Sequence, residues 1–296
     1  MITIGAYDGV HLGHQAVIAL VRERAQALGA VSMVLTFDRH PASVVRPESA
    51  PKLLTDPEQK LEMLAATGVD ATVLCHFDQD RAVESPEEFV RELLVKRLNA
   101  RCVVVGSDFH FGHQRRGNVA LLRSMGAQLG FDVEPVDLVA RVDGVNEPVS
   151  STAIRRALAG GEVEVAGHLL GRAFEVRGVV AKGDQRGRTI GFPTANVVMP
   201  DSVCLPADGV YAGFYERPDG SVHPCAINLG RRPTFYEHAD HSLLEAHLLD
   251  FNGDLYGESA KVRFVAFLRS ERKFDGIDAL VAQLKADVEA TRRATT

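Results

Sequence analysis

The chain has 296 residues, of which 46% are hydrophobic and 24% are charged, a profile typical of a soluble globular protein long enough for two domains. Its formal net charge of −6 argues against a broad nucleic-acid surface, because phosphate backbones require clustered positive charge. No apolar run approaches the roughly 20 residues of a membrane span, and no signal-peptide pattern is present, so we expect a cytoplasmic protein without a membrane partner. The four cysteines form no CxxC pair, so we expect no zinc site.

The first half of the sequence alternates short apolar runs with helical patterns. The predicted strands are 2–4, 31–37, 71–76, 101–106 and 131–136, and the predicted helices are 15–28, 57–67, 86–98 and 118–129. This alternation implies an α/β fold with an open, doubly wound parallel sheet and crossover helices. Ligands in such sheets bind at the carboxyl ends of the strands.

The segment after the first strand reads GAYDGVHLGH and leads into a helix. A strand-to-helix turn presents unpaired backbone N–H groups and the positive end of the helix to a ligand. Gly9 and Gly13 would let a phosphate approach the backbone, and His11 and His14 would share one face of the first helical turn. A lone histidine near a turn is more often a solvated side chain, but HxGH between a strand and a helix is typical of nucleotidyl transfer, in which imidazoles hydrogen-bond the α-phosphate.

A second polar cluster, SSTAIRR, precedes a short helix. Ser151 and Thr152 can simply cap that helix. Alternatively, Arg155, one turn further, can bind the β- and γ-phosphates of ATP. Because the histidine pair is present, we interpret this cluster as part of an ATP site.

Two more polar segments come directly after predicted strands, where a doubly wound sheet binds its ligands. Phe37, Asp38 and His40 stand in TFDRHP, and Asp108 stands in GSDFHFG. Core packing is the alternative role for Phe37 and for the other aromatic residues of both segments.

From about residue 172 the pattern changes to short strands separated by Gly, Pro and Asp-Gly turns, which favours an antiparallel barrel. The candidate strands are 174–180, 194–198, 209–216, 223–229, 242–249 and 261–268. A final helix carries an apolar stripe between Phe274 and Val288. We therefore expect one domain over 1–160 and a second over 172–296, joined near 160–171.

The barrel half contains a second candidate phosphate site. Lys182 and Gly183 open a glycine-rich basic loop that could hold ATP phosphates, although the chain has no P-loop motif. Thr194 and Asn196 are two residues apart, so on a strand they would share a side and offer oxygen ligands to Mg²⁺. In LLEAHLLDF, Glu245 would face away from the core and could act as a general base, although an ordinary exposed glutamate fits the pattern equally well.

With these motifs in order, the chain resembles the bacterial bifunctional riboflavin kinase/FMN adenylyltransferase family nearly end to end. The shared segments are YDGVHLGH, DRHP, GSDFHFG, SSTAIR, LLGRAF, GRTIGFPTAN, DGVYAG, NLGRRPTF, EAHLLDFNGDLYG and LRSERKFDG. The resemblance implies a Rossmann-like adenylyltransferase domain followed by a six-stranded kinase barrel. It also implies Mg²⁺ as cofactor with ATP, riboflavin as substrate, and FMN and FAD as products.

The resemblance further implies roles for single residues. Residues that match the ATP-binding motifs of the adenylyltransferase are His11, His14, Ser151, Thr152 and Arg155, with Asp108 near the nucleotide. Phe37 and the DRHP loop would lie toward FMN. In the kinase, Thr194 and Asn196 match the Mg²⁺–ATP residues, and Glu245 matches the base that activates the terminal ribityl hydroxyl.

The chain departs from the family pattern at Tyr7, where Phe is usual, and at Arg39, where Pro is usual. A first strand of three residues is expected to weaken the adenylyltransferase module. One alternative function is a riboflavin kinase with an inactive N-terminal module, against which the intact His11 and His14 argue. Another is a non-enzymatic flavin carrier or regulator, which would have no need for a base such as Glu245.

Overall fold

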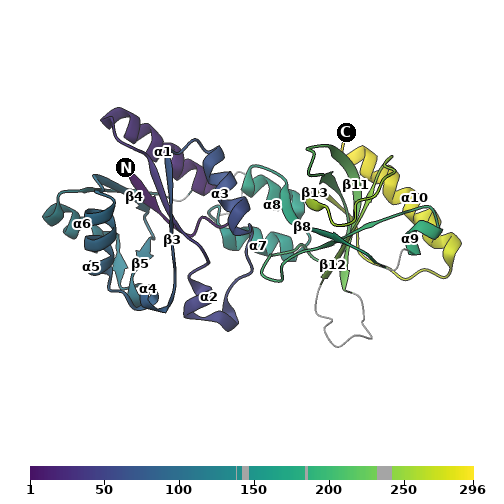
Figure 1. Ribbon diagram of the computed structural model, residues 1–296, viewed down its shortest axis with the longest axis horizontal. Helices are drawn as coiled ribbons and strands as arrows, with labels where there is room; N and C mark the ends of the chain where they lie inside the picture. Colours follow the sequence, from purple (N-terminus) through teal and green to yellow (C-terminus); the bar gives the residue numbers. More distant parts are fainter. Residues whose placement is uncertain (138, 142–146, 184–185, 232–241) are drawn as a thin grey trace. The chain divides into compact units, whose positions relative to one another are not determined.

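The computed structural model describes residues 1–137, 139–141, 147–183, 186–231 and 242–296. The chain forms two compact units, Met1–Ser151 and Thr152–Thr296 (Figure 1). The sequence-based boundary at 160 lies later than this division, because helices α7 (Ser151–Ala159) and α8 (Val163–Leu170) pack with the barrel. The Ala207 N–H donates to the Leu158 carbonyl (2.8 Å), and the Phe267 N–H donates to the Glu164 carboxylate (3.1 Å).

The first unit contains a five-stranded sheet in the order β3-β2-β1-β4-β7, and all of its strand pairs are parallel. Its strands are β1 (Ile2–Ile4), β2 (Met33–Phe37), β3 (Ala71–Cys75), β4 (Cys102–Gly106) and β7 (Asp132–Val136). The predicted open parallel sheet is therefore confirmed. Because the chain order reverses on either side of β1, the turn after β1 lies at the switch point where such sheets bind ligands.

Helices cover both faces of this sheet, as the helical spacing of apolar residues requires. On one face, α1 (Leu12–Leu28) and α3 (Pro57–Ala66) place Ile18, Val21 and Leu64 against the sheet. On the other face, the π-helical segment η2 (Phe89–Arg97) and α6 (Val119–Leu129) pack on alternate strand residues such as Leu35 and Val103. The two faces thus bury neighbouring residues of one strand in separate cores.

Local caps set the ends of these helices. His11 caps α1, so the helix begins at Leu12, before the predicted position 15. The Asp56 carboxylate accepts from the Gln59 N–H (2.7 Å) and starts α3, with Pro57 in the first turn. The helix predicted over 86–98 is a short α5 (Pro86–Glu88) that continues as η2, because apolar spacing does not separate α- from π-helical winding.

Shorter elements of the first unit were not predicted. They are α2 (Ala42–Val45), η1 (Pro47–Ser49), α4 (Gln79–Val83), β5 (His110–Phe111), η3 (His113–Arg115) and β6 (Gly117–Asn118). Segments of two to five residues are too short to show a hydrophobic period. Most of them connect the ends of the sheet strands to the following helices.

The second unit contains a closed antiparallel barrel in the order β10-β11-β12-β9-β8-β13, which confirms the expected six-stranded barrel (Figure 1). Its strands are β8 (Phe174–Ala181), β9 (Ala195–Val198), β10 (Gly209–Glu216), β11 (Val222–Arg231), β12 (Ser242–Leu248) and β13 (Ser259–Arg269). A short helix, α9 (Arg186–Thr189), precedes β9. Closure leaves no unpaired barrel edge.

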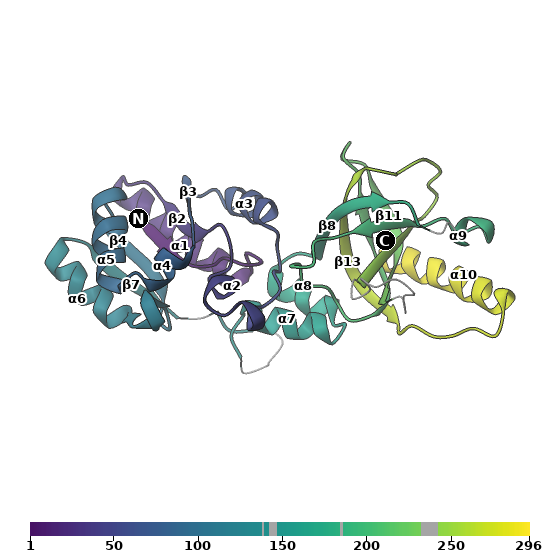
Figure 2. The same cartoon turned by 60° about the horizontal axis from the view of Figure 1, so that its bottom comes forward.

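The last helix, α10 (Ile277–Ala294), lies along the barrel (Figure 2). Inside the barrel, Leu244, Ala246 and Leu248 of β12 are buried, as their alternation predicts. The intervening Glu245 and His247 therefore point to the outer face, toward α10. In the described part of the chain, no helix is both long and apolar enough to cross a membrane.

Candidate active sites

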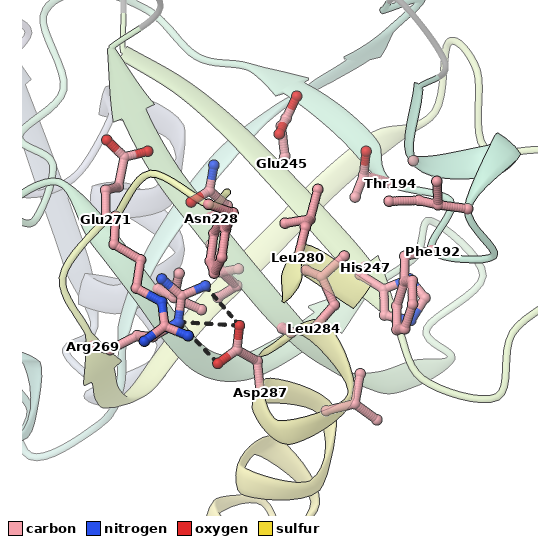
Figure 3. A pocket seen from close by; sticks show the side chains of 18 of the residues that line it. Phe192, Thr194, Asn228, Glu245, His247, Arg269, Glu271, Leu280, Leu284 and Asp287 are labelled. Carbon is pink, nitrogen blue, oxygen red and sulfur yellow. Dashed lines mark hydrogen bonds and ion pairs between the residues drawn. The ribbon is translucent and has the colours of Figure 1, made fainter. Parts of the chain in front are cut away.

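A pocket of about 430 Å³ lies between the outer face of the barrel and α10 (Figure 3). Strand residues and loop residues form one wall, and Leu280, Leu284 and Val288 of α10 form an apolar wall opposite. The polar residues of the lining are Thr194, Asn196, Asn228, Glu245, His247, Arg269, Glu271, Arg272 and Asp287. An apolar cavity with a few converging polar groups is the usual form of a small-molecule site.

Three predicted kinase residues converge in this pocket. Glu245 of β12 is the register partner of Asn196 in β9, and both line the pocket with Thr194. The sequence predicted Thr194 in the strand, whereas it lies just before β9. Its side chain still lines the same pocket (Figure 3). The carboxylate of Glu245 and the side-chain oxygens of Thr194 and Asn196 thus line one pocket.

The Asn196 side chain is enclosed in a way that suits a cation. Within the described residues, its buried Oδ1 has no hydrogen-bond partner, which is costly unless a ligand completes it. A Cβ at Gly183 would lie 2.4 Å from Asn196 Nδ2, so only glycine lets the loop pass this close. The neutral oxygens of Thr194 and Asn196 match the hard oxygen ligands that Mg²⁺ takes, so the residues present fit that ion.

The loop that contains Lys182 and Gly183 is only partly described, because residues 184 and 185 lie outside the described ranges. Lys182 follows β8 and does not line the pocket, and its ammonium lies 5.8 Å from the Tyr256 ring centre. Downstream, the Gly187 carbonyl accepts from the Phe192 N–H (2.8 Å) and closes the turn before Thr194. The NLGRRPTF segment also runs outside the described residues from 232.

A buried ion pair fixes α10 to the barrel at the edge of this pocket. Arg269, at the end of β13, donates to both carboxylate oxygens of Asp287 over 2.8 to 3.2 Å (Figure 3). The Asp287 side chain is 5% exposed, and it also accepts from the Gln283 amide (2.7 Å). This contact holds the apolar wall of α10 against the barrel.

Sequence reasoning missed a second carboxylate in the pocket, Glu271. Burial raises its pKa, as do the nearby charges of Asp208 and Glu245, whereas a hydrogen bond with Asn228 lowers it. Asn228 is the register partner of Glu245, so the amide lies between the two acids. The segment LRSERKFDG carried the signal for Glu271, but nothing in its local spacing shows that it faces Glu245.

In the first unit, the two HxGH imidazoles stack. His11 Nδ1 accepts from the His14 N–H (3.3 Å) as the cap of α1, and the ring centres are 3.6 Å apart. Since its Nδ1 accepts, a neutral His11 carries its proton on Nε2, where it can donate. Burial, and then the charge of His11, lowers the pKa of His14 well below its ordinary value, so His14 is neutral near pH 7. Its buried Nδ1 has no partner within the described ranges.

The turn that carries the histidines is anchored by Asp8, which is 5% exposed. Its carboxylate accepts from the N–H groups of Leu54 (2.9 Å) and Thr55 (3.2 Å). Its carbonyl accepts from the Ser151 hydroxyl (2.9 Å), so the predicted ATP residue Ser151 contacts this turn. Gly9 has φ +83°, the left-handed conformation that glycine adopts without strain. Asp8 therefore joins the HxGH turn to the segment that precedes α3.

The flavin-side prediction falls on a charged loop after β2. Phe37 packs edge-to-face on Phe77 (5.2 Å), so it has the packing role that was the alternative for aromatic residues. His40 Nδ1 accepts from the Ala42 N–H (3.1 Å) at the start of α2. Asp38 and His40 line a cavity of about 20 Å³ together with Asp8.

Asp38 is the best-connected acid of this loop. Its carboxylate accepts from the Phe77 N–H (3.0 Å), contacts His76 Nδ1 (2.6 Å) and pairs with Arg39 (3.3 Å). Burial alone would raise its pKa, but the hydrogen bonds to Phe77, His76 and Arg39 lower the pKa to about 2. Arg39, the departure from the family pattern, is thus used locally as a partner of Asp38.

We expect Asp38→Asn to destabilise the protein at neutral pH and to have little effect at the acidic end. Because the folded pKa of about 2 lies below the unfolded value of 3.8, Asp38 contributes stability above pH 4 that is lost as the pH falls toward 2. Thermal unfolding of both proteins from pH 7 to pH 3 measures this difference. A Tm difference that stays constant over that range would contradict it.

The other predicted residues lie in less enclosed positions. Asp108 follows β4 and is exposed, and its carbonyl faces His110 Nδ1 (2.7 Å). Gly13 adjoins the His11 ring, since a Cβ there would lie 3.2 Å from it. Thr152 and Arg155 lie on α7, which belongs to the compact unit of the barrel.

The chain matches two protein families, one in each half. Residues 1–153 match the FAD synthetase family, and residues 170–295 match the riboflavin kinase family. Three relatives are named bifunctional riboflavin kinase/FMN adenylyltransferase. The protein of Listeria monocytogenes is 39% identical over 99% of this chain and 91% of its own length. Those of Haemophilus influenzae (37%, covering 98% and 92%) and Bacillus subtilis (36%, covering 99% and 92%) are comparably similar.

A solved structure has the same fold over nearly the whole chain. It is a crystal structure described as a macrolide-efflux protein from Streptococcus pneumoniae, with a TM-score of 0.88 and 34% identity. The match covers 98% of this chain and 93% of that one. Its name differs from those of the relatives, whereas the two family matches agree with the relatives' names.

Proposed function

Because the chain belongs to the bifunctional riboflavin kinase/FMN adenylyltransferase family, we propose that residues 172–296 carry the kinase activity and that residues 1–160 carry the adenylyltransferase activity. The protein is a transferase that phosphorylates riboflavin to FMN and adenylates FMN to FAD. ATP is the donor in both steps. We place these reactions in the cytoplasm, where ATP is available.

In the proposed kinase step, riboflavin lies in the pocket between the barrel and α10. The ring system would pack on Leu280 and Leu284, which supply an apolar surface. Glu245 accepts the proton of the terminal ribityl hydroxyl as its oxygen attacks the γ-phosphorus of ATP. The bond between that phosphorus and the bridging oxygen breaks, so ADP leaves and FMN forms. No covalent enzyme intermediate is required, because orientation and charge neutralisation suffice.

We propose that Thr194 and Asn196 hold Mg²⁺ together with the phosphates of ATP. The enclosed Asn196 oxygen without a partner among the described residues supports this role. Mg²⁺ usually takes only one or two protein ligands and keeps waters and phosphate oxygens, which suits a site with two neutral oxygens. When bound, the ion neutralises charge on the transferred phosphoryl group.

In the proposed adenylation step, a phosphate oxygen of FMN attacks the α-phosphorus of a second ATP. His11 and His14 donate hydrogen bonds to the α-phosphate oxygens as their charge increases. Gly9, Gly13, Ser151, Thr152 and Asp108 would surround the nucleotide, and Arg155 would bind the leaving pyrophosphate. Phe37, Asp38 and His40 would lie on the flavin side.

The observation that carries this proposal is the convergence of Thr194, Asn196 and Glu245 on one pocket with an apolar wall. Product analysis over time tests it, with the full chain, riboflavin, ATP and Mg²⁺. We expect FMN to appear first and FAD after a lag, and both to disappear when EDTA removes the metal. FMN that accumulates without FAD would support a kinase with an inactive first module. Tight flavin binding without turnover would support a carrier.

A further inference from the structure

Lys60 of α3 is a buried charge that the proposed chemistry does not use. The residue is 7% exposed. Burial lowers the pKa of its ammonium, against the charges of Asp8 and Asp38, which raise it. Removing a lysine from water is costly, and lysine is rarely buried unless it is paired. Its burial beside the candidate adenylylation site therefore calls for a physical reason.

Lys60 contacts the end of the strand that leads into the flavin-side loop. Its Nζ donates to the Phe37 carbonyl over 2.6 Å, and Phe37 is the last residue of β2. Because the peptide unit is planar, a fixed carbonyl also fixes the direction of the following N–H and Cα. The hydrogen bond therefore sets how the chain enters the segment from Asp38 to His40.

The surroundings of Lys60 contain two buried or half-buried carboxylates. Asp8 anchors the HxGH turn to Leu54 and Thr55, and Asp38 anchors the end of β2 to Phe77. Both acids and Lys60 line the same small cavity. The charge of Lys60 interacts with both acids, and Arg39 pairs with Asp38, so positive charge offsets the repulsion between the two carboxylates.

The size of this cavity bears on whether Lys60 contacts a ligand itself or acts through the loop. Its volume of about 20 Å³ is close to what one water molecule needs and is far too small for a phosphate or a flavin ring. Arg39 and His40 complete its polar lining, together with Thr55. Its size therefore favours a role of Lys60 through the loop over direct contact with a phosphate or a flavin ring in this cavity.

We propose that Lys60 is a positioning residue for FMN adenylation, whose ammonium holds the Phe37 carbonyl beside Asp8 and Asp38 so that the loop from Asp38 to His40 is formed before FMN binds. A preformed loop lowers the ordering cost of binding, which is expressed in KM and not in the chemical step. This inference rests on the proposed location of FMN at that loop.

The test compares Lys60→Met, which has a similar length but no charge or donor, with Lys60→Arg, which keeps both. Lys96→Met is the matched control, because Lys96 is in the same unit and its side chain is 66% exposed. FAD formation from FMN and ATP is measured at varied concentrations of each substrate. For Lys60→Met we expect the KM for FMN to rise about tenfold, with kcat and the KM for ATP within about threefold of the wild type. Lys60→Arg should recover most of the loss, and Lys96→Met should match the wild type.

Several outcomes would overturn this role. A lower kcat at unchanged KM for FMN would mean that Lys60 acts in the reaction. If Lys60→Met and Lys60→Arg both lost affinity for FMN and ATP equally, and ATP no longer raised their Tm, Lys60 would only stabilise the core of the unit. A His40→Ala variant separates the positioning role of Lys60 from the proposed location of FMN. If His40→Ala raises the KM for FMN and Lys60→Met does not, only the positioning role is wrong. If neither changes that KM, the proposed location of FMN is wrong.

Discussion

A chain with Glu245→Ala is expected to lose FMN formation, by about 10²-fold or more in kcat, while it still converts supplied FMN to FAD. The carboxylate lies in the kinase pocket beside Thr194 and Asn196, and the proposed step needs a group that removes the ribityl proton. Its replacement leaves the first unit unchanged. Separate assays with riboflavin plus ATP and with FMN plus ATP measure the two activities in one preparation.

Two further variants sharpen this expectation. Glu245→Gln keeps the size and polarity of the side chain but cannot accept the proton, so it should be nearly as inactive as Glu245→Ala. Glu289→Gln is the control, because that acid lies on α10 with its side chain 66% exposed. If Glu245→Gln retained normal FMN formation, the role of Glu245 as a base would be wrong.

For His14→Ala we expect the opposite pattern, a loss of FAD formation with normal phosphorylation of riboflavin. Removing one preorganised donor to a developing charge costs about 10²- to 10³-fold in kcat, which is the loss we expect here. Because His14 stacks on His11 at 3.6 Å, the substitution also frees the neighbouring ring and can add to the loss. The same two assays measure both effects.

His168→Ala serves as the control for this substitution, because His168 is an exposed histidine on α8. Riboflavin phosphorylation by the His14→Ala protein reports that the barrel unit is folded. Thermal stabilisation by ATP and Mg²⁺ reports on what remains of nucleotide binding. If folded His14→Ala protein had lost both activities, the assignment of one reaction to each unit would be wrong.

Long elements with a clear hydrophobic period were predicted closely. The strand expected over 209–216 is β10 (Gly209–Glu216), because alternation and its flanking turns are local signals. The helix α8 lies where the sequence predicts only a join between domains, since Gly160, Gly161, Gly167 and Gly171 are all close by. Its buried residues, Val163, Ala166, Leu169 and Leu170, do have helical spacing. The four glycines favour a loop, but the helical spacing of the apolar residues decides the structure of this segment.

In the candidate sites, too, contacts set by local spacing could be predicted, and contacts between distant segments could not. The pairing of His11 with His14, and of Thr194 with Asn196, follows from spacings of three and two residues and could be expected from the sequence. The hydrogen bonds from Leu54 to Asp8 and from Lys60 to Phe37 join segments 46 and 23 residues apart. No local pattern encodes such contacts, because they depend on how the sheet and helices pack.

The position of α7 has a practical consequence for dissecting this enzyme. By its contacts, the helix with Thr152 and Arg155 folds with the barrel, although its proposed ligand is the nucleotide of the other reaction. Severing the polypeptide after Ser151 would therefore yield an N-terminal fragment without the guanidinium proposed for pyrophosphate. A separately produced barrel fragment should begin at residue 152, because one that begins at 172 would lose the hydrogen bond from the Phe267 N–H to Glu164 of α8.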